Sequence, residues 1–183
     1  MIPAIKTKYN DILFKSRLEA RWAAFFDLMN WKWEYEPIDC NGWIPDFVIY
    51  GKKFMGYDKE PEDIILLVEV KPFHKLKQYD IKKYVKAINN TIYKSDEILL
   101  LGSTINIISS NECSIGWLND RTCFDEDYNF DKCLINKLGG FFHYSGFYGC
   151  RITGEYEGDH NNSCKSNEIK KRWNIAYERT KYR

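Results

Sequence analysis

The apolar run at residues 64–68 constrains the fold most, because it stops abruptly at charged residues. The run reads Ile-Ile-Leu-Leu-Val, and Glu69 and Lys71 follow with one valine between them. Side chains alternate between the two faces of a strand, so both faces are apolar until Glu69 and Lys71 emerge together on one of them. This pattern predicts a central strand that is covered on both sides and whose charged end leaves the core. Pro72 has no N–H to donate, and it predicts where the pairing ends.

A second acidic residue, Asp46, precedes this strand in a segment that also has a strand-like pattern. Residues 43–50 predict a strand that ends at Gly51. If this strand pairs with the apolar one, Asp46 and Glu69 converge near Lys71. Two neighbouring carboxylates repel each other unless a cation lies between them, and hard oxygen ligands suit Mg²⁺ or Mn²⁺. The competing interpretation is a strand end that runs into solvent, where Glu and Lys are common; the presence of Asp46 favours the metal site.

A helix with a strong start signal is predicted upstream, at residues 16–29. Leu18 and Trp22 begin an apolar stripe at helical spacing. Ser16 and Glu19 have the spacing of a capping box, in which the Glu19 carboxylate reaches back to the Ser16 N–H. This spacing indicates a structural role for Glu19 at the helix start.

The rest of the chain alternates strand-like and helix-like segments as far as residue 102. Residues 31–36 alternate apolar and polar side chains, as a half-buried strand does. Residues 75–92 predict a helix with lysines on one face, and residues 97–102 predict a buried strand, so that strand, helix and strand imply a parallel crossover. Further expectations are an arm or short edge strand at 1–10, a polar hairpin loop at 51–63, strands at 105–108 and 114–118, an irregular segment at 119–165, and a closing helix at 166–180 with Ile169, Trp173, Ala176 and Tyr177 facing inward.

Length and composition predict one soluble globular domain. A chain of 183 residues with 44% hydrophobic residues can build a single core. No apolar run reaches the roughly 18 residues that a membrane helix needs. Residues 1–6 lack the apolar core of a signal peptide. We therefore expect a cytoplasmic protein with no membrane partner.

The six cysteines predict reduced thiols rather than disulfides, because no secretion signal is evident. None of them forms a Cys-x-x-Cys pair. Thiolate and imidazole are the usual zinc ligands, so Cys150, Cys164 and His160 with His143 or Cys133 could bind zinc. Their spacing is irregular, which favours incidental cysteines, and Zn²⁺ is not expected.

The net charge of +1 hides an uneven distribution along the chain. Residues 74–94 hold six lysines and one acid, and residues 165–183 hold seven basic residues and two acids. Residues 111–131 are acidic instead. A basic face could neutralise the phosphates of a nucleic acid, although ordinary solvated helix faces have a similar charge density. The residues expected to contact DNA are Arg21, Lys75, Lys82 and Lys86.

Residues 45–46 (Pro-Asp) and 69–71 (Glu-Val-Lys) together resemble the motif of the PD-(D/E)xK nuclease superfamily, which has the restriction-endonuclease-like fold. The resemblance extends to residues 14–23 and 33–37, which are similar to the opening helix and first strand of small phage- and bacteria-associated members. Residues 176–180 resemble the terminal helix of that group. The resemblance therefore implies a protein of a bacterial cell or a phage-infected host.

The fold implied by this resemblance is α/β, with a central mixed β-sheet flanked by helices. It implies a single nuclease-like domain over residues 1–183. The core would span about residues 10–110 and the C-terminal helix at 166–181. The remaining residues, about 111–165, would form an irregular insertion in the C-terminal half.

The activity implied by the resemblance is metal-dependent hydrolysis of DNA phosphodiester bonds by an endonuclease. Asp46 and Glu69 would bind Mg²⁺, for which Mn²⁺ would substitute, with the Val70 backbone carbonyl as a third ligand. Lys71, with a pKa lowered by the charge of the metal, would assist the attacking water. Glu19 would be a catalytic residue that faces the metal site and holds a second metal or a metal-bound water, and the resemblance favours this role over capping.

Three other functions are compatible with the same residues. A Holliday-junction or branched-DNA resolvase shares this type of site, and it implies a homodimer because two strands must be cut. A non-catalytic nucleic-acid-binding or inhibitory protein could retain the fold, since a fold does not decide function. A protein-interaction module could use the acidic segment at 111–131 as a mimic of DNA.

Overall fold

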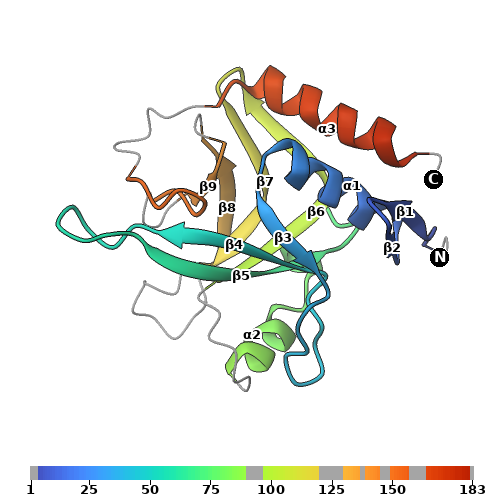
Figure 1. Ribbon diagram of the computed structural model, residues 1–183, viewed down its shortest axis with the longest axis horizontal. Helices are drawn as coiled ribbons and strands as arrows, with labels where there is room; N and C mark the ends of the chain where they lie inside the picture. Colours follow the sequence, from blue (N-terminus) through green and yellow to red (C-terminus); the bar gives the residue numbers. More distant parts are fainter. Residues whose placement is uncertain are drawn as a thin grey trace.

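A mixed seven-stranded sheet organises the protein, and helices cover both of its faces (Figure 1). The computed structural model describes residues 4–89, 97–119, 130–136, 139–144, 149–156 and 164–181. The described elements are β1 (Thr7–Tyr9), β2 (Ile12–Phe14), α1 (Arg17–Leu28), β3 (Lys32–Tyr35), β4 (Phe47–Lys53), β5 (Glu62–Val70), the 3₁₀ turn η1 (Leu76–Gln78), α2 (Ile81–Asn89), β6 (Glu97–Ser109), β7 (Glu112–Asn119), β8 (Phe130–Ile135), β9 (Phe141–His143) and α3 (Ser166–Thr180). The expected α/β class with a central mixed sheet is confirmed.

The strand order is β3-β4-β5-β6-β7-β8-β9, so β5 has a partner on each side. Only the β5–β6 pair is parallel among these described ladders. The chain passes from β5 to β6 through η1 and α2, which is the predicted parallel crossover. The strand at residues 64–68 is therefore central, as its two apolar faces predicted.

The two faces of β5 belong to two separate apolar clusters. Leu66 and Val68 pack in the cluster that also contains Trp22 of α1 and Trp173 of α3. Leu67 packs in the other cluster, together with Tyr84 of α2. Figure 1 shows α1 and α3 together on one side of the sheet and α2 on the other. Burial on both faces explains why the run is apolar at every position until Glu69.

The predicted helices are present with two corrections. Residues 75–92 do not form one helix, because η1 is followed by a break and α2 begins at Ile81. The Asp80 carboxylate accepts a hydrogen bond from the Lys83 N–H at 3.2 Å, as an N-cap residue does. In α3, Ile169, Trp173 and Ala176 are buried as predicted, but Tyr177 is 40% exposed.

Strand β4 differs from its prediction at both ends. It begins at Phe47 rather than at residue 43, and it continues through Gly51 to Lys53. Gly51 does not end the strand, because it pairs with Ile64 of β5. A glycine is needed at this position, since a Cβ there would lie 1.9 Å from the carbonyl oxygen of Arg151. The neighbouring Lys52 N–H donates to that same oxygen at 3.0 Å. The loop between β4 and β5 is correspondingly shorter than the predicted loop at 51–63.

The expectation of an irregular insertion at about 111–165 is wrong for its described strands. The strand predicted at 114–118 is confirmed as β7, and β8 and β9, which were not predicted, extend the central sheet from it by antiparallel pairing. The strands predicted at 97–102 and 105–108 form one long strand, β6, with a register shift between Leu101 and Asn106 in its pairing with β7. The segment at 1–10 contributes β1, which pairs with β2 as a separate hairpin. Among the described helices, none is both long and apolar enough to cross a membrane.

Candidate functional site

Asp46 and Glu69 face each other across the β4–β5 pair, where both strands reach the same edge of the fold. Phe47 pairs with Val68. Asp46 comes directly before Phe47, and Glu69 comes directly after Val68. The Asp46 carboxylate accepts a hydrogen bond from the Val70 N–H at 2.7 Å. Antiparallel pairing therefore positions the two acids, and this backbone contact orients the first of them.

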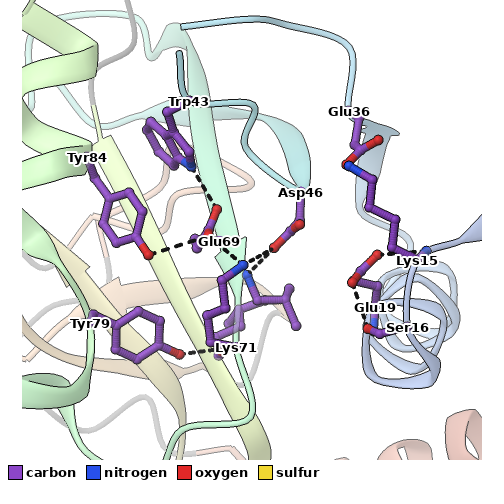
Figure 2. A network of polar contacts seen from close by, with 12 residues as sticks. Lys15, Ser16, Glu19, Glu36, Trp43, Asp46, Glu69, Lys71, Tyr79 and Tyr84 are labelled. Carbon is purple, nitrogen blue, oxygen red and sulfur yellow. Dashed lines mark hydrogen bonds and ion pairs between the residues drawn. The ribbon is translucent and has the colours of Figure 1, made fainter. Parts of the chain in front are cut away.

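Lys71 completes the cluster, as Figure 2 shows. Its Nζ lies 2.6 Å from Glu69 Oε1 and 3.6 Å from Asp46 Oδ2. Both acids are buried, with exposed fractions of 7% for Asp46 and 4% for Glu69. The structure thus brings together the three side chains whose convergence the sequence predicts.

Two aromatic residues that the sequence did not single out hold Glu69 in place. The Trp43 indole N–H donates to Glu69 Oε2 at 2.8 Å, and the Tyr84 hydroxyl lies 3.4 Å from Oε1. The two rings also pack against each other, with centroids 4.8 Å apart. Tyr84 was recognisable only as part of the apolar face of a helix, and no spacing links Trp43 to Glu69. Both residues are buried in the apolar cluster that includes α2, and Figure 2 shows them on the opposite side of Glu69 from Asp46.

Burial and the charges of this cluster shift the pKa of Asp46 and that of Lys71. Burial raises the pKa of Asp46 to about 7, helped by the charge of Glu69 and opposed by Lys71 and the Val70 N–H. Burial by itself would lower the pKa of Lys71, but the charges of Asp46 and Glu69 outweigh it and the pKa is raised. Lys71 is therefore an ammonium ion here, and the lowered pKa expected from the sequence depends on the charge of a bound metal.

The raised pKa of Asp46 predicts that stability depends on pH. The pKa rises from 3.8 to about 7 on folding, so this group contributes stability that is fully present below pH 3.8 and is lost as the pH rises through about 7. We expect its contribution to the free energy of unfolding to fall by roughly 4 kcal/mol over that range. Urea denaturation of the wild type and of Asp46→Asn at a series of pH values measures the contribution of Asp46 to the free energy of unfolding. Identical pH slopes for the two proteins would contradict it.

The oxygen donors of the cluster fit a hard divalent cation. Mg²⁺ is usually held by one or two carboxylates and completes its shell with waters and substrate phosphates. Asp46 and Glu69 supply two carboxylates, although no group of three or more His, Cys, Asp or Glu ligands occurs in the described ranges. The N–H and C=O of a strand residue point to the same side. The Val70 N–H donates to Asp46, and a metal role for the Val70 carbonyl stays a prediction.

Glu19 has the capping role that its spacing with Ser16 indicated. The Glu19 N–H donates to Ser16 Oγ at 3.1 Å, and the Ser16 hydroxyl donates back to Glu19 Oε1 at 2.7 Å. The other oxygen accepts from the Lys15 N–H and the Tyr35 hydroxyl, so the carboxylate reaches back to Lys15 rather than to the Ser16 N–H. Its charge nevertheless contributes to the raised pKa of Asp46. In Figure 2, Glu19 lies on the far side of Asp46 from Glu69, and a metal role for it stays a prediction.

The predicted DNA-contacting residues lie on two different faces. Lys75, Lys82 and Lys86 are exposed on η1 and α2, the helix that also supplies Tyr84. The Arg21 guanidinium instead lies over the Tyr177 ring, with its carbon 4.4 Å from the ring centroid. Arg21 therefore joins α1 to α3 on the opposite side of the sheet from α2.

The cysteine and histidine residues considered for zinc are dispersed where the structure describes them. Cys133 pairs with His143 across β8 and β9. Cys164 instead contacts Cys113, and the Cys150 thiol accepts a hydrogen bond from the Thr153 N–H. His160 lies outside the described residues.

Comparison with known proteins returned no family model, no curated protein and no solved structure that matches this chain. The fold and the site together define an α/β protein with a mixed seven-stranded sheet and a buried carboxylate pair at the end of its central strand.

Proposed function

We propose that the protein is a metal-dependent endonuclease that hydrolyses DNA phosphodiester bonds. The observation that carries this proposal is the convergence of Asp46, Glu69 and Lys71, with Lys71 Nζ 2.6 Å and 3.6 Å from the two carboxylates. Two buried acids and one ammonium ion leave the cluster with a net negative charge when both acids are ionised. Such a cluster favours a divalent cation, which would lower the pKa of the two acids by its charge.

Each residue of the cluster has a distinct role in this proposal. Asp46 and Glu69 hold the metal, which when bound acidifies water and neutralises charge on the scissile phosphate. Lys71 orients the attacking water and adds positive charge beside the phosphate. Trp43 keeps Glu69 in the orientation that the metal requires, because its N–H occupies one oxygen and leaves the other turned toward Lys71.

The basic face beside the site supports DNA as the substrate. Lys75 lies four residues after Lys71, and Lys82 and Lys86 are exposed on α2, whose buried face carries Tyr84 against Glu69. Lysines contribute sequence-independent affinity by neutralising phosphates, so binding should weaken as salt rises. A branched-DNA resolvase is a narrower form of the same proposal, and it implies a homodimer.

One observation favours a non-catalytic nucleic-acid-binding protein as the second candidate. Glu69 is already hydrogen-bonded by Trp43 and Tyr84 and ion-paired with Lys71. A carboxylate with that many partners is stable without a metal. Such a protein would bind DNA through α2 without cutting it.

A substrate panel tests the proposal directly. Purified protein is incubated with plasmid, linear duplex, single-stranded and four-way-junction DNA, each with Mg²⁺, Mn²⁺ or EDTA. We expect cleavage of at least one form with either metal and none with EDTA. Binding of DNA without cleavage in any metal condition supports the second candidate, and symmetric cuts confined to the junction identify the resolvase.

A further inference from the structure

Two cysteine thiols that the proposed site does not use lie in direct contact. Cys113 belongs to β7, and Cys164 lies two residues before the start of α3. They are 51 positions apart in the sequence, yet their sulfur atoms are 3.1 Å apart. Both side chains are buried. The fold therefore brings together two thiols from distant parts of the chain.

The surrounding backbone already joins these two segments. The Ser166 N–H at the start of α3 donates to the carbonyl oxygen of Ser110, in the turn between β6 and β7, at 3.1 Å. A covalent link between the thiols would reinforce a contact that exists.

The environment of the pair makes one sulfur the better nucleophile. The hydrogen bond with Cys113 lowers the pKa of Cys164, burial opposes this shift, and the Ser166 hydroxyl also lowers the pKa. The pKa of Cys113 is raised by the same hydrogen bond and by burial. A thiolate, rather than a thiol, attacks an oxidant. We therefore assign Cys164, whose sulfur also lies 3.8 Å from the Ser166 hydroxyl oxygen, as the residue that reacts first, and Cys113 as the one that resolves the product.

We propose that Cys113 and Cys164 are an oxidation site at which hydrogen peroxide produces a disulfide between β7 and α3. The Cys164 thiolate attacks one peroxide oxygen, the O–O bond breaks, and a sulfenic acid forms as the first water leaves. The Cys113 sulfur then attacks the Cys164 sulfur, an S–S bond forms, and the hydroxyl leaves as a second water. The two thiols lose two electrons and two protons, and the peroxide is reduced to water.

The disulfide would restrict the chain between its two ends and hold α3 on the sheet. Trp173 of α3 packs on Trp22 of α1, with ring centroids 4.4 Å apart, so a fixed α3 also supports α1. Closing a loop of this length stabilises a protein chiefly by restricting the unfolded chain. We expect the oxidised protein to melt about 10 °C above the reduced protein.

The experiment compares peroxide-treated and dithiothreitol-treated full-length protein after alkylation of the remaining thiols. We expect a decrease of about 2 Da in intact mass before alkylation, the loss of two of the six alkylatable thiols, and one cross-linked peptide pair that contains Cys113 and Cys164. Dithiothreitol should restore both thiols and the lower melting temperature.

Variants separate this pair from the other cysteines. Cys113→Ser and Cys164→Ser should each abolish the cross-link and the increase in melting temperature, whereas Cys40→Ser, a buried cysteine outside the pair, should retain both. The peptide map of the wild type decides the question even if a variant does not fold. Six free thiols after peroxide, a sulfinic acid at Cys164, or a disulfide between other cysteines would overturn the proposal.

Discussion

Asp46→Asn is expected to lower the rate of Mg²⁺-dependent DNA cleavage by about a thousandfold or more. The metal supplies several kcal/mol of charge stabilisation in such a reaction, and each 1.36 kcal/mol is a factor of ten in rate. Asparagine keeps the size of the side chain and an oxygen that can accept the Val70 N–H, which lies 2.7 Å from Asp46 in the wild type. The substitution therefore removes the charge and leaves the local hydrogen bond.

Metal binding can be measured separately from cleavage in the same variant. At about pH 8, where Asp46 is ionised, Mg²⁺ should raise the melting temperature of the wild type and leave Asp46→Asn unchanged, because a ligand stabilises only the state that binds it. Asp63→Asn is the matched control: this exposed acid lies at the other end of β5, paired with Lys52. Cleavage by Asp46→Asn at the wild-type rate would show that Asp46 is not a catalytic residue. Metal binding without cleavage of any DNA by the wild type would preserve the metal site but not the nuclease.

Arg151→Met is expected to lower the free energy of unfolding by about 3–5 kcal/mol, because it leaves a buried carboxylate without its main partner. The Arg151 guanidinium donates through Nε to Glu97 Oε2 at 2.8 Å, and both side chains are fully buried. Lys53 Nζ lies 3.4 Å from the other oxygen of Glu97 and retains part of the compensation. The loss should therefore fall toward the lower end of this range.

Urea denaturation at neutral pH measures this effect. Lys165→Met, which removes an exposed ion pair with Glu168, is the control and should change stability little. Adding Glu97→Leu to Arg151→Met should recover part of the loss, since the fully buried carboxylate is then gone and only the partly exposed Lys53 ammonium loses a partner. If the single and double variants are equally unstable, the unpaired Glu97 carboxylate is not the cause of the loss.

The elements predicted best are those in which burial or a helix cap determines the residue types within the element itself. The run at residues 64–68 is apolar at every position because α1 and α3 cover one face of β5 and α2 covers the other. The helix at α1 has a capping residue, Ser16, at its start and an apolar stripe along its length. Burial and capping restrict the residue types at particular positions, so the pattern of the sequence indicates these elements.

The elements predicted worst depend on partners far away in the chain. β8 and β9 are short, and their segment has no clean period, so only their pairing with β7 makes them strands. Gly51 has the pattern of a strand end, yet it lies within β4 and pairs with Ile64 of β5, and its lack of a side chain leaves room for the Arg151 backbone. Tyr177 has helical spacing with the buried residues of α3, but it lies at the margin of the face, where it contacts Arg21.

By itself the sequence determined the central strand, the parallel crossover through α2, and the convergence of Asp46, Glu69 and Lys71, because strand alternation and antiparallel pairing need only local patterns. The tertiary structure alone decided that Trp43 and Tyr84 hold Glu69, and that Cys113 contacts Cys164. It also decided that the Glu19 carboxylate is hydrogen-bonded at the start of α1. These contacts join residues without a shared period. They arise only when the packed sheet brings the segments within hydrogen-bonding distance.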